Sequence, residues 1–193
     1  MLVTLEGLDG SGKSTACEEL QDRFPSAVFT REPTGSWYGE AVRRSVADEG
    51  ADPIAELFLY CADHAAHLCD TVKPALKTGK LVISDRYVDS RIAYQGVTLK
   101  EQLDDPAGFV REIHEPFTVM PDLTCFIEVE IHTALHRSDC STKFERRTFL
   151  ESVNKEYQRL IDTDTQRFVI IDGEQPIDAV VDDIEEAIRA HLS

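Results

Sequence analysis

The amino-acid sequence predicts a single α/β domain with a central, mostly parallel five-stranded sheet flanked by helices. Five short apolar segments alternate with stretches of helical periodicity, which is the order expected for a parallel sheet covered on both faces. A glycine-rich turn joins the first apolar segment to the first helical one. The length of 193 residues suits one domain, so we expect residues 1–193 to form a single unit.

The N-terminal elements are a strand, a helix and a second strand. Met1–Glu6 is mostly apolar and is followed directly by glycine. A helix with an apolar face then begins at Lys13 and ends before Pro25, because proline cannot continue a helix. Ala27–Thr30 is expected to form the second strand.

A long helix and the third strand follow. Asp52 is a favourable N-cap residue, and Pro53 suits the first helical turn. The helix is expected to run to Lys77 and to stop at Gly79. Leu81–Asp85 is expected to form the third strand.

The C-terminal part carries the last two strands and two helices. Leu123–Val129 is the expected fourth strand and Phe168–Ile171 the fifth. A charged segment, residues 137–147, precedes a helix at about residues 145–160. An amphipathic helix over Pro176–His191 closes the chain.

Charge limits the classes of ligand that the chain can bind. Asp and Glu number 36 against 20 Lys and Arg, which gives a net charge of −16. Such a protein repels anions at long range, so a phosphate site needs a local cluster of cations, and nucleic acid is not an expected partner. The acidic residues are spread along the chain, which suits a halophilic protein that works in concentrated salt.

Composition also bears on location. No apolar run is long enough to cross a bilayer, and the N-terminus lacks the features of a signal peptide. We therefore expect a cytoplasmic protein without a membrane partner. The five cysteines follow no metal-binding spacing and are expected to be reduced packing residues.

Residues 7–15, GLDGSGKST, match the phosphate-binding pattern G-x-x-x-x-G-K-[ST] between a strand and a helix. Backbone N–H groups of such a loop converge on phosphate oxygens, so we expect it to bind a nucleoside triphosphate. Lys13 is expected at the β- and γ-phosphates and Ser14 on Mg²⁺. Asp85 is the second candidate for the metal, although it could instead cap the next helix. The loop residues expected to contact ATP are Gly7, Leu8, Asp9, Gly10, Ser11, Gly12, Lys13, Ser14 and Thr15.

Further segments appear in one order along the chain: TREP at residues 30–33, LYCADHAAHL at 59–68, ISDRYVDSRIAYQG at 83–96 and IDGEQPID at 171–178. Together with the phosphate loop they resemble thymidylate kinase. The resemblance implies a three-layer P-loop kinase with a short lid at residues 137–147. It also implies ATP-dependent phosphorylation of dTMP to dTDP with Mg²⁺, by a homodimer.

The resemblance assigns substrate contacts by position. Asp9 would hold the sugar 3′-hydroxyl, Tyr94 would lie beneath the deoxyribose, and Tyr60 would stack on the base. Gln95 would meet the thymine edge, and Arg86 would grip the phosphate of dTMP. The full set expected at the substrate is Asp9, Arg31, Glu32, Arg43, Tyr60, His64, Arg86, Arg91, Tyr94 and Gln95.

The base-reading residues depart from the family pattern. Most relatives have Arg where this chain has His64, and a small polar residue where it has Arg91. A neutral His donates one hydrogen bond and is the weaker partner for a carbonyl oxygen. Our hypothesis is that Arg91 takes over the contact with thymine O4. The alternative is that Arg91 pairs with a surface acid.

The lid is the second departure, because it is short in this chain. In family members whose phosphate loop lacks an internal Arg, as this one does, the resemblance implies that the lid supplies the catalytic Arg. Arg137 is the best candidate to lie over the adenine or bridge the phosphates, and Lys143 stands where Arg is common. Arg146 and Arg147 are further candidates that could equally lie on the surface of a helix. The expected catalytic set is Lys13, Arg86, Arg137 and Lys143, and Arg137 and Gln175 are also expected to contact ATP.

Two alternatives to dTMP phosphorylation stay open. A kinase of another deoxypyrimidine monophosphate, such as dUMP, is the nearer one, because His64 alters the base-reading set. The other is a GTPase switch, which the absence of an N-K-x-D guanine signature disfavours. Phosphoryl transfer to a monophosphate needs no general base, because the attacking oxygen is already anionic, so alignment and cationic side chains would carry the reaction.

Overall fold

The computed structural model describes residues 1–138 and 147–192. The strands are β1 (Leu2–Glu6), β2 (Val28–Arg31), β3 (Val82–Asp85), β4 (Leu123–Glu128) and β5 (Phe168–Asp172). The helices are α1 (Lys13–Arg23), α2 (Trp37–Val46), α3 (Pro53–His67), α4 (Lys73–Lys77), α5 (Val88–Thr98), α6 (Pro106–His114), α7 (Ile131–Arg137), α8 (Arg147–Thr163) and α9 (Ile177–Leu192). Of these helices, none is long and apolar enough to cross a membrane.

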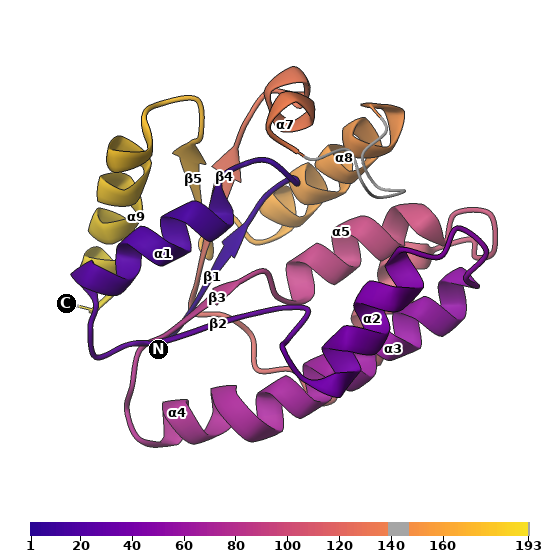
Figure 1. Ribbon diagram of the computed structural model, residues 1–193, viewed down its shortest axis with the longest axis horizontal. Coiled ribbons are helices and arrows are strands. Elements are labelled where there is room, and N and C mark those ends of the chain that lie inside the picture. Colours follow the sequence, from indigo (N-terminus) through magenta and orange to yellow (C-terminus); the bar gives the residue numbers. More distant parts are fainter. Residues whose placement is uncertain (139–146, 193) are drawn as a thin grey trace.

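The strands form one sheet in the order β2-β3-β1-β4-β5. All four neighbouring pairs are parallel, so the sheet predicted to be mostly parallel is parallel throughout. Helices α1 and α9 pack together on one face, and α3, α5 and α8 lie on the other (Figure 1). The predicted α/β class with helices on both faces is confirmed.

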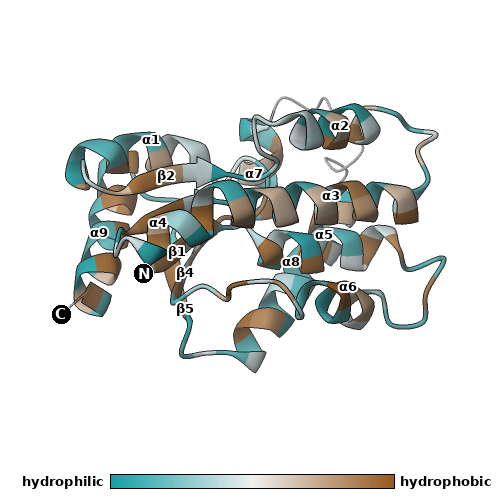
Figure 2. Cartoon of the chain, turned by 90° about the horizontal axis from the view of Figure 1, so that it is seen from below, coloured by the Kyte–Doolittle hydropathy of each residue, from teal (hydrophilic) through white to brown (hydrophobic). Residues whose placement is uncertain are grey.

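The core is divided by the sheet into two apolar clusters, one on each face. In β1, Leu2 belongs to the cluster beneath α3, α5 and α8, whereas Val3 and Leu5 belong to the cluster beneath α1 and α9. This alternation follows from the two-residue period of a strand. Thr4 and Glu6 therefore face α5 and α8, where buried polar groups are found. The apolar strands contrast with the largely hydrophilic loops in Figure 2.

The long helix predicted after Asp52 is present but is not uniform. The Asp52 carboxylate accepts a hydrogen bond of 2.9 Å from the backbone N–H of Ala55, as expected of an N-cap. A π-helical turn, Leu68–Val72, separates α3 from α4. Pro74 lies just beyond this turn and lacks the N–H that a regular α-helix would use. Gly79 follows the helix with a φ of +72°.

Three short helices, α2, α6 and α7, were not predicted from the sequence. Ser36 is the N-cap of α2, and its hydroxyl accepts a hydrogen bond from the Gly39 N–H; Asp105 is the N-cap of α6, and its carboxylate accepts one from the Gly108 N–H. Each has between seven and ten residues, so its apolar period is too short to stand out.

Candidate active site

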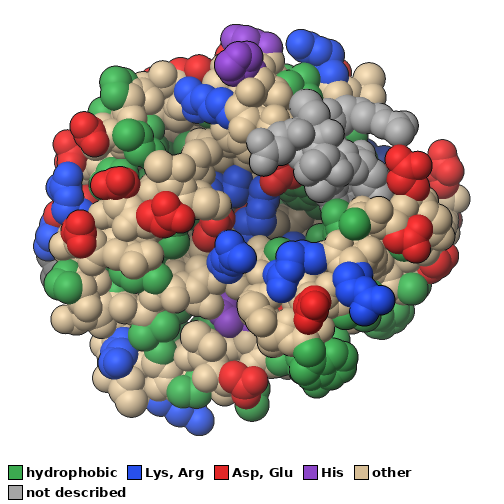
Figure 3. Space-filling model, in the orientation of Figure 1, with side chains coloured by type: hydrophobic (Ala, Val, Ile, Leu, Met, Phe, Trp, Pro, Cys, Tyr) green, Lys and Arg blue, Asp and Glu red, His purple; other side chains and the backbone are tan. Residues whose placement is uncertain are grey.

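The predicted site residues gather where the parallel strands end. The phosphate loop follows β1, the TREP segment follows β2, and Asp85 and Arg86 lie at the end of β3. Carboxyl ends of parallel strands share one edge of a sheet, which is where such folds bind ligands. Figure 3 shows a hollow in which Lys and Arg side chains gather, although the whole chain is acidic. The local cluster of cations that a phosphate site requires is therefore present.

The phosphate loop depends on glycine at three positions. Gly7, Gly10 and Gly12 have φ values of +144°, +82° and +94°, which side chains rarely allow. A Cβ at Gly10 would lie 2.3 Å from the carbonyl oxygen of Ala134, so glycine also lets α7 approach the loop. The loop turns tightly, with a hydrogen bond of 3.1 Å from the Ser11 N–H to the Leu8 carbonyl.

Lys13 is buried within its own loop. Its Nζ donates to the Leu8 carbonyl at 2.6 Å and to Ser11 Oγ at 3.1 Å. Burial lowers the pKa of Lys13 to about 8, with a further contribution from the positive charge of Arg86. The ammonium group is thus still mainly charged at neutral pH and can exchange these neutral partners for phosphate oxygens.

Ser14 and Asp85 form the arrangement expected for a metal that also binds phosphate. Ser14 Oγ donates to Asp85 Oδ2 at 2.6 Å, while Asp85 Oδ1 is buried and has no hydrogen-bond partner. In the described part of the chain no group of three or more His, Cys, Asp and Glu residues could hold a metal ion. One hydroxyl and one carboxylate fit Mg²⁺, which commonly takes few protein ligands and completes its shell with water and phosphate.

Arg86 links the phosphate loop to the end of β3. Its backbone has a φ of +68°, a left-handed conformation that is uncommon outside glycine and asparagine and often marks functional residues. Its guanidinium donates to Asp9 Oδ1 at 2.5 Å, to the Gly7 carbonyl at 3.2 Å and to Ser90 Oγ at 3.0 Å. The guanidinium carbon also lies 5.1 Å from the centre of the Tyr94 ring.

Asp9 and Tyr94 are joined by two hydrogen bonds. The Asp9 N–H donates to the Tyr94 hydroxyl at 3.1 Å, and that hydroxyl donates to Asp9 Oδ2 at 3.1 Å. Burial opposes ionisation of Asp9, but the charges of Arg86 and Lys13 outweigh it, so the pKa of Asp9 is lowered. The carboxylate is therefore ionised at neutral pH and can accept a hydrogen bond from a hydroxyl group.

Glu6 is a buried carboxylate beneath Arg86 that the sequence analysis missed. It accepts hydrogen bonds from the Tyr87 N–H at 2.8 Å, Ser90 Oγ at 2.5 Å and the Tyr157 hydroxyl at 2.9 Å. Because Ser90 Oγ also accepts from Arg86, Glu6 supports the guanidinium through one intermediate hydroxyl. Burial raises the pKa of Glu6 to about 7.

Tyr60 on α3 and Arg91 and Gln95 on α5 are buried side chains of two helices that contact each other. The Arg91 guanidinium lies over the Tyr60 ring, with its carbon 4.1 Å from the ring centre. Arg91 and Gln95 are separated by one helical turn, which places them on one face of α5. Neither amide atom of Gln95 has a hydrogen-bond partner, and neither does Nε of Arg91. Unpaired polar atoms are costly when buried, so these side chains suit contact with a polar ligand.

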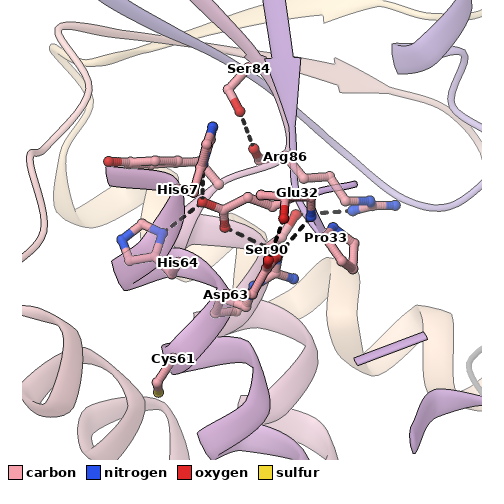
Figure 4. A network of polar contacts seen from close by, with 12 residues as sticks. Glu32, Pro33, Cys61, Asp63, His64, His67, Ser84, Arg86 and Ser90 are labelled. Atoms are coloured by element: carbon pink, nitrogen blue, oxygen red, sulfur yellow. Dashed lines mark hydrogen bonds and ion pairs between the residues drawn. The ribbon is translucent and has the colours of Figure 1, made fainter. Parts of the chain in front are cut away.

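His64, on the same helix as Tyr60, is completely buried. Its Nδ1 is 2.7 Å from Glu32 Oε1 and its Nε2 is 3.0 Å from Thr118 Oγ1, so both ring nitrogens are engaged. Glu32 also contacts His67 and Arg91, as Figure 4 shows in part. Arg91 is thus paired with a buried acid and not with a surface acid.

The remaining arginines near the acceptor side are exposed. Arg43 Nη1 donates to the Thr34 carbonyl at 2.8 Å, which ties α2 to the segment after β2. Thr34 is held in turn by Asp63 on α3, whose Oδ2 accepts from the Thr34 N–H at 2.8 Å. Arg31, the last residue of β2, is exposed.

The expected ATP contacts outside the loop lie near the end of β5. Arg137 donates to the Gly173 carbonyl at 3.0 Å, and Gln175 Nε2 donates to Asp183 Oδ2 at 2.6 Å. Arg147 is exposed and lies 3.8 Å from Glu151 one turn along α8. Lys143 and Arg146 lie outside the described residues.

Comparison with known proteins identifies the family. A sequence profile described as thymidylate kinase matches residues 5–184. A probable thymidylate kinase from Natronomonas pharaonis is 51% identical over 100% of both chains. One from Halobacterium salinarum is 52% identical over 100% of this chain and 97% of the relative. Both genera are halophilic, which fits the acidic composition.

A solved structure agrees with the sequence relatives. The crystal structure of thymidylate kinase from Ehrlichia chaffeensis superimposes with a TM-score of 0.77 at 27% identity, and the match covers 97% of this chain and 98% of that one. The phosphate loop and residues Tyr60, Arg86, Arg91 and Gln95 all lie within residues 5–184, which the family profile matches. The chain therefore belongs to the thymidylate kinase family and is a nucleoside monophosphate kinase.

Proposed function

We propose that the chain transfers the γ-phosphoryl group of ATP to dTMP, producing ADP and dTDP, with Mg²⁺ as the metal. The observation that carries the proposal is the ion pair of Arg86 with Asp9. Asp9 is part of the phosphate loop. Arg86 follows β3, and its guanidinium carbon lies 5.1 Å from the centre of the ring of Tyr94, which is on the helix that also carries Gln95. The two charged side chains would connect the loop that binds the phosphate donor with the residues that bind the acceptor, which supports a direct transfer between two nucleotides.

The cationic side chains would align and neutralise the reacting phosphates. An oxygen of the dTMP phosphate would attack the γ-phosphorus in line, and the bond to the β-phosphate oxygen would break. Lys13 would bind the β- and γ-phosphate oxygens, and Arg86 would hold the attacking phosphate. Arg is suited to this role because its planar fork binds phosphate through two hydrogen bonds. Arg31 and Arg43 would lie at the edge of the same phosphate.

Ser14 and Asp85 would hold Mg²⁺, and the metal would supply positive charge that offsets the negative charge on the reacting phosphates. Arg137 would supply a cation from the end of α7, near the backbone at Gly173. The adenine of ATP would lie beside this backbone and Gln175.

The hydrogen-bonding groups of Arg91 and Gln95 favour a pyrimidine base with a carbonyl group at position 4. Arg91 can only donate hydrogen bonds, so it would favour O4 of thymine or uracil over the amino group of cytosine. Gln95 offers one donor and one acceptor, which suits the adjacent N3–H and carbonyl of the same base. Tyr60 would stack on the ring, and Tyr94 with Asp9 would hold the deoxyribose. Uracil presents the same polar edge as thymine, so dUMP is the competing substrate.

An assay of ADP release tests the proposal. The protein would be incubated with ATP and Mg²⁺ together with dTMP, dUMP, dCMP or no acceptor, at low and high KCl. We expect dTMP to give the largest kcat/KM and dCMP to give little turnover. Equal ADP release in all four reactions would refute phosphoryl transfer to a pyrimidine monophosphate.

We also propose that the chain forms a homodimer through α2 and α3. Trp37 and Phe58 on these helices are 67% and 53% exposed, which is unusual for large apolar side chains. Leu57 and Tyr60 in the same segment are buried in the core. Light scattering on the wild type and on Phe58→Asp would test this, because the substitution should shift the mass from dimer to monomer.

A further inference from the structure

Glu32 is a buried carboxylate that joins three structural elements. It follows β2, and its side chain is 1% exposed. Its Oε1 lies 2.7 Å from Nδ1 of His64 and 2.7 Å from Nδ1 of His67, both on α3. Its Oε2 accepts a hydrogen bond of 3.2 Å from Nη2 of Arg91 on α5. Figure 4 shows the carboxylate between the two histidine rings.

The hydrogen-bond partners place a proton on Nδ1 of each histidine. A carboxylate can only accept, so each Nδ1 must donate to Glu32. Each Nε2 faces a hydroxyl, which can donate or accept: Thr118 Oγ1 at 3.0 Å for His64 and Thr30 Oγ1 at 2.7 Å for His67. Every polar atom of both rings is satisfied in this arrangement.

The cluster pairs one buried carboxylate, Glu32, with one buried guanidinium, Arg91. Burial alone would raise the pKa of Glu32, but His64, His67 and Arg91 lower it well below its usual value. Glu32 is therefore ionised and compensates the buried charge of Arg91. Without this partner Arg91 would be a buried, unpaired cation, which is strongly unfavourable.

The histidines also fix the direction of the carboxylate. His64 and His67 are three residues apart on α3, so they lie on one face of the helix and approach the same oxygen. The other oxygen is left to Arg91, whose guanidinium also lies over the Tyr60 ring. The orientation of Arg91 is thus determined from two directions before any ligand binds.

We infer that Glu32, His64 and His67 are positioning residues that hold the Arg91 guanidinium in the orientation in which it reads the base. This inference rests on the proposed function, in which Arg91 contacts O4 of the pyrimidine. His64 would then act on the base only through Glu32. The three residues would affect the binding of dTMP and its discrimination from dCMP more than the transfer step.

Substitution of Glu32 by Gln tests the inference, because it keeps the shape and removes the charge. We expect the KM for dTMP to rise about tenfold, as for loss of a hydrogen bond to a charged group, and kcat and the KM for ATP to change less than about twofold. The preference for dTMP over dCMP should fall. The matched control is Glu156→Gln, which removes another buried, ion-paired carboxylate, on α8, and should leave the KM for dTMP unchanged.

A double-mutant cycle separates a positioning role from a general loss of stability. If Glu32 acts through Arg91, adding Glu32→Gln to Arg91→Ala should change the KM for dTMP by less than about twofold, because coupled residues are non-additive. If each substitution instead raised the KM for dTMP by its own factor, and the two factors multiplied in the double variant, the inference would be overturned. If the wild type fails to phosphorylate dTMP, the proposed function is wrong, whereas a normal wild type with an unchanged Glu32→Gln variant rejects only the inference.

Variants of His67 keep the test decisive if Glu32→Gln does not fold. Asn at position 67 places an amide donor near the position of Nδ1, whereas Phe keeps the ring and removes the donor. We expect His67→Phe to raise the KM for dTMP, and we expect His67→Asn to have a KM close to that of the wild type. Equal KM values for both variants and the wild type would overturn the inference.

Discussion

The guanidinium of Arg86 donates to the carboxylate of Asp9 at a distance of 2.5 Å, across 77 positions of the sequence. This contact joins the end of β3 to the phosphate loop. Arg86 makes it from a left-handed backbone conformation, with a φ of +68°. In the proposed function Arg86 holds the attacking phosphate, so we expect activity to be sensitive to substitution of this residue.

Substitution of Arg86 by Lys should reduce kcat by about 100-fold or more, because the charge is kept but the two-pronged hydrogen bonding is lost. The KM for dTMP should rise as well. Steady-state kinetics with dTMP and ATP measure both quantities. Arg159→Lys is the control, because Arg159 is 73% exposed and pairs with Glu156 on the same helix. If Arg86→Lys retained wild-type kinetics, Arg86 would not bind the transferred or attacking phosphate.

Removal of the Ser14 hydroxyl should increase the requirement for Mg²⁺. We expect Ser14→Ala to raise the Mg²⁺ concentration for half-maximal activity about tenfold, by analogy with the loss of groups that support a metal site. Asp85→Asn should act in the same direction, since the carboxylate that pairs with Ser14 is lost. Titration of activity with Mg²⁺ at saturating ATP measures the effect. Ser152→Ala, which removes an exposed hydroxyl on α8, should leave the titration unchanged.

Replacement of Arg91 by Ser should raise the KM for dTMP tenfold or more, because a hydrogen bond from a charged group contributes about 1.5–3 kcal/mol. The ratio of kcat/KM for dTMP to that for dCMP should also fall. Arg44→Ser, an exposed arginine on α2, serves as the control. A change in KM below about twofold for Arg91→Ser would exclude a contact between Arg91 and the base.

The phosphate loop could be predicted from the sequence because all of its parts are adjacent. Gly7, Gly12, Lys13 and Ser14 lie within eight residues, and the strand and helix on either side fix their geometry. The alternation of strands with helices likewise gave the fold class, since it depends on local periodicity. These features require no knowledge of how distant segments pack.

The buried side chains that hold the site residues in place could not be predicted from the sequence, because their contacts join segments that are far apart along the chain. Glu6 and Tyr157 are 151 positions apart, and Glu32 and His67 are 35 apart. Their contacts depend on the order of the strands and on the packing of α3 and α8, which no local pattern specifies. We expected His64 to contact the base, because the sequence does not reveal that both of its ring nitrogens contact other side chains of the protein.

Acid should destabilise the protein partly through His114. Burial lowers the pKa of this histidine to about 4, from an ordinary value of 6.5. Between these values the unfolded chain binds a proton that the folded protein does not, so stability is full above pH 6.5 and falls as the pH drops towards 4. The difference corresponds to at most about 3 kcal/mol in the free energy of unfolding.

Denaturant unfolding of His114→Asn at several pH values checks this expectation. Asn keeps a donor near Nδ1, which bonds to the Val110 carbonyl at 2.8 Å, but it does not titrate. The variant should lose less stability than the wild type between pH 6.5 and 4. His191→Asn is the matched control, because His191 makes the same bond to Ala187 but is exposed. Equal pH slopes for the wild type and His114→Asn would contradict the prediction.

Salt should stabilise the folded protein, because its net charge of −16 opposes compaction. The screening length falls from about 10 Å at 0.1 M to about 3 Å at 1 M ionic strength, so molar KCl should raise the melting temperature. Thermal melts from 0.1 to 3 M KCl measure the change. Three exposed acids of α1 can be neutralised by Glu18→Gln, Glu19→Gln and Asp22→Asn. This triple variant should melt at a higher temperature than the wild type at low salt, and its melting temperature should rise less when KCl is added. A melting temperature that falls with KCl, or a triple variant with an unchanged salt response, would show that charge repulsion does not limit stability.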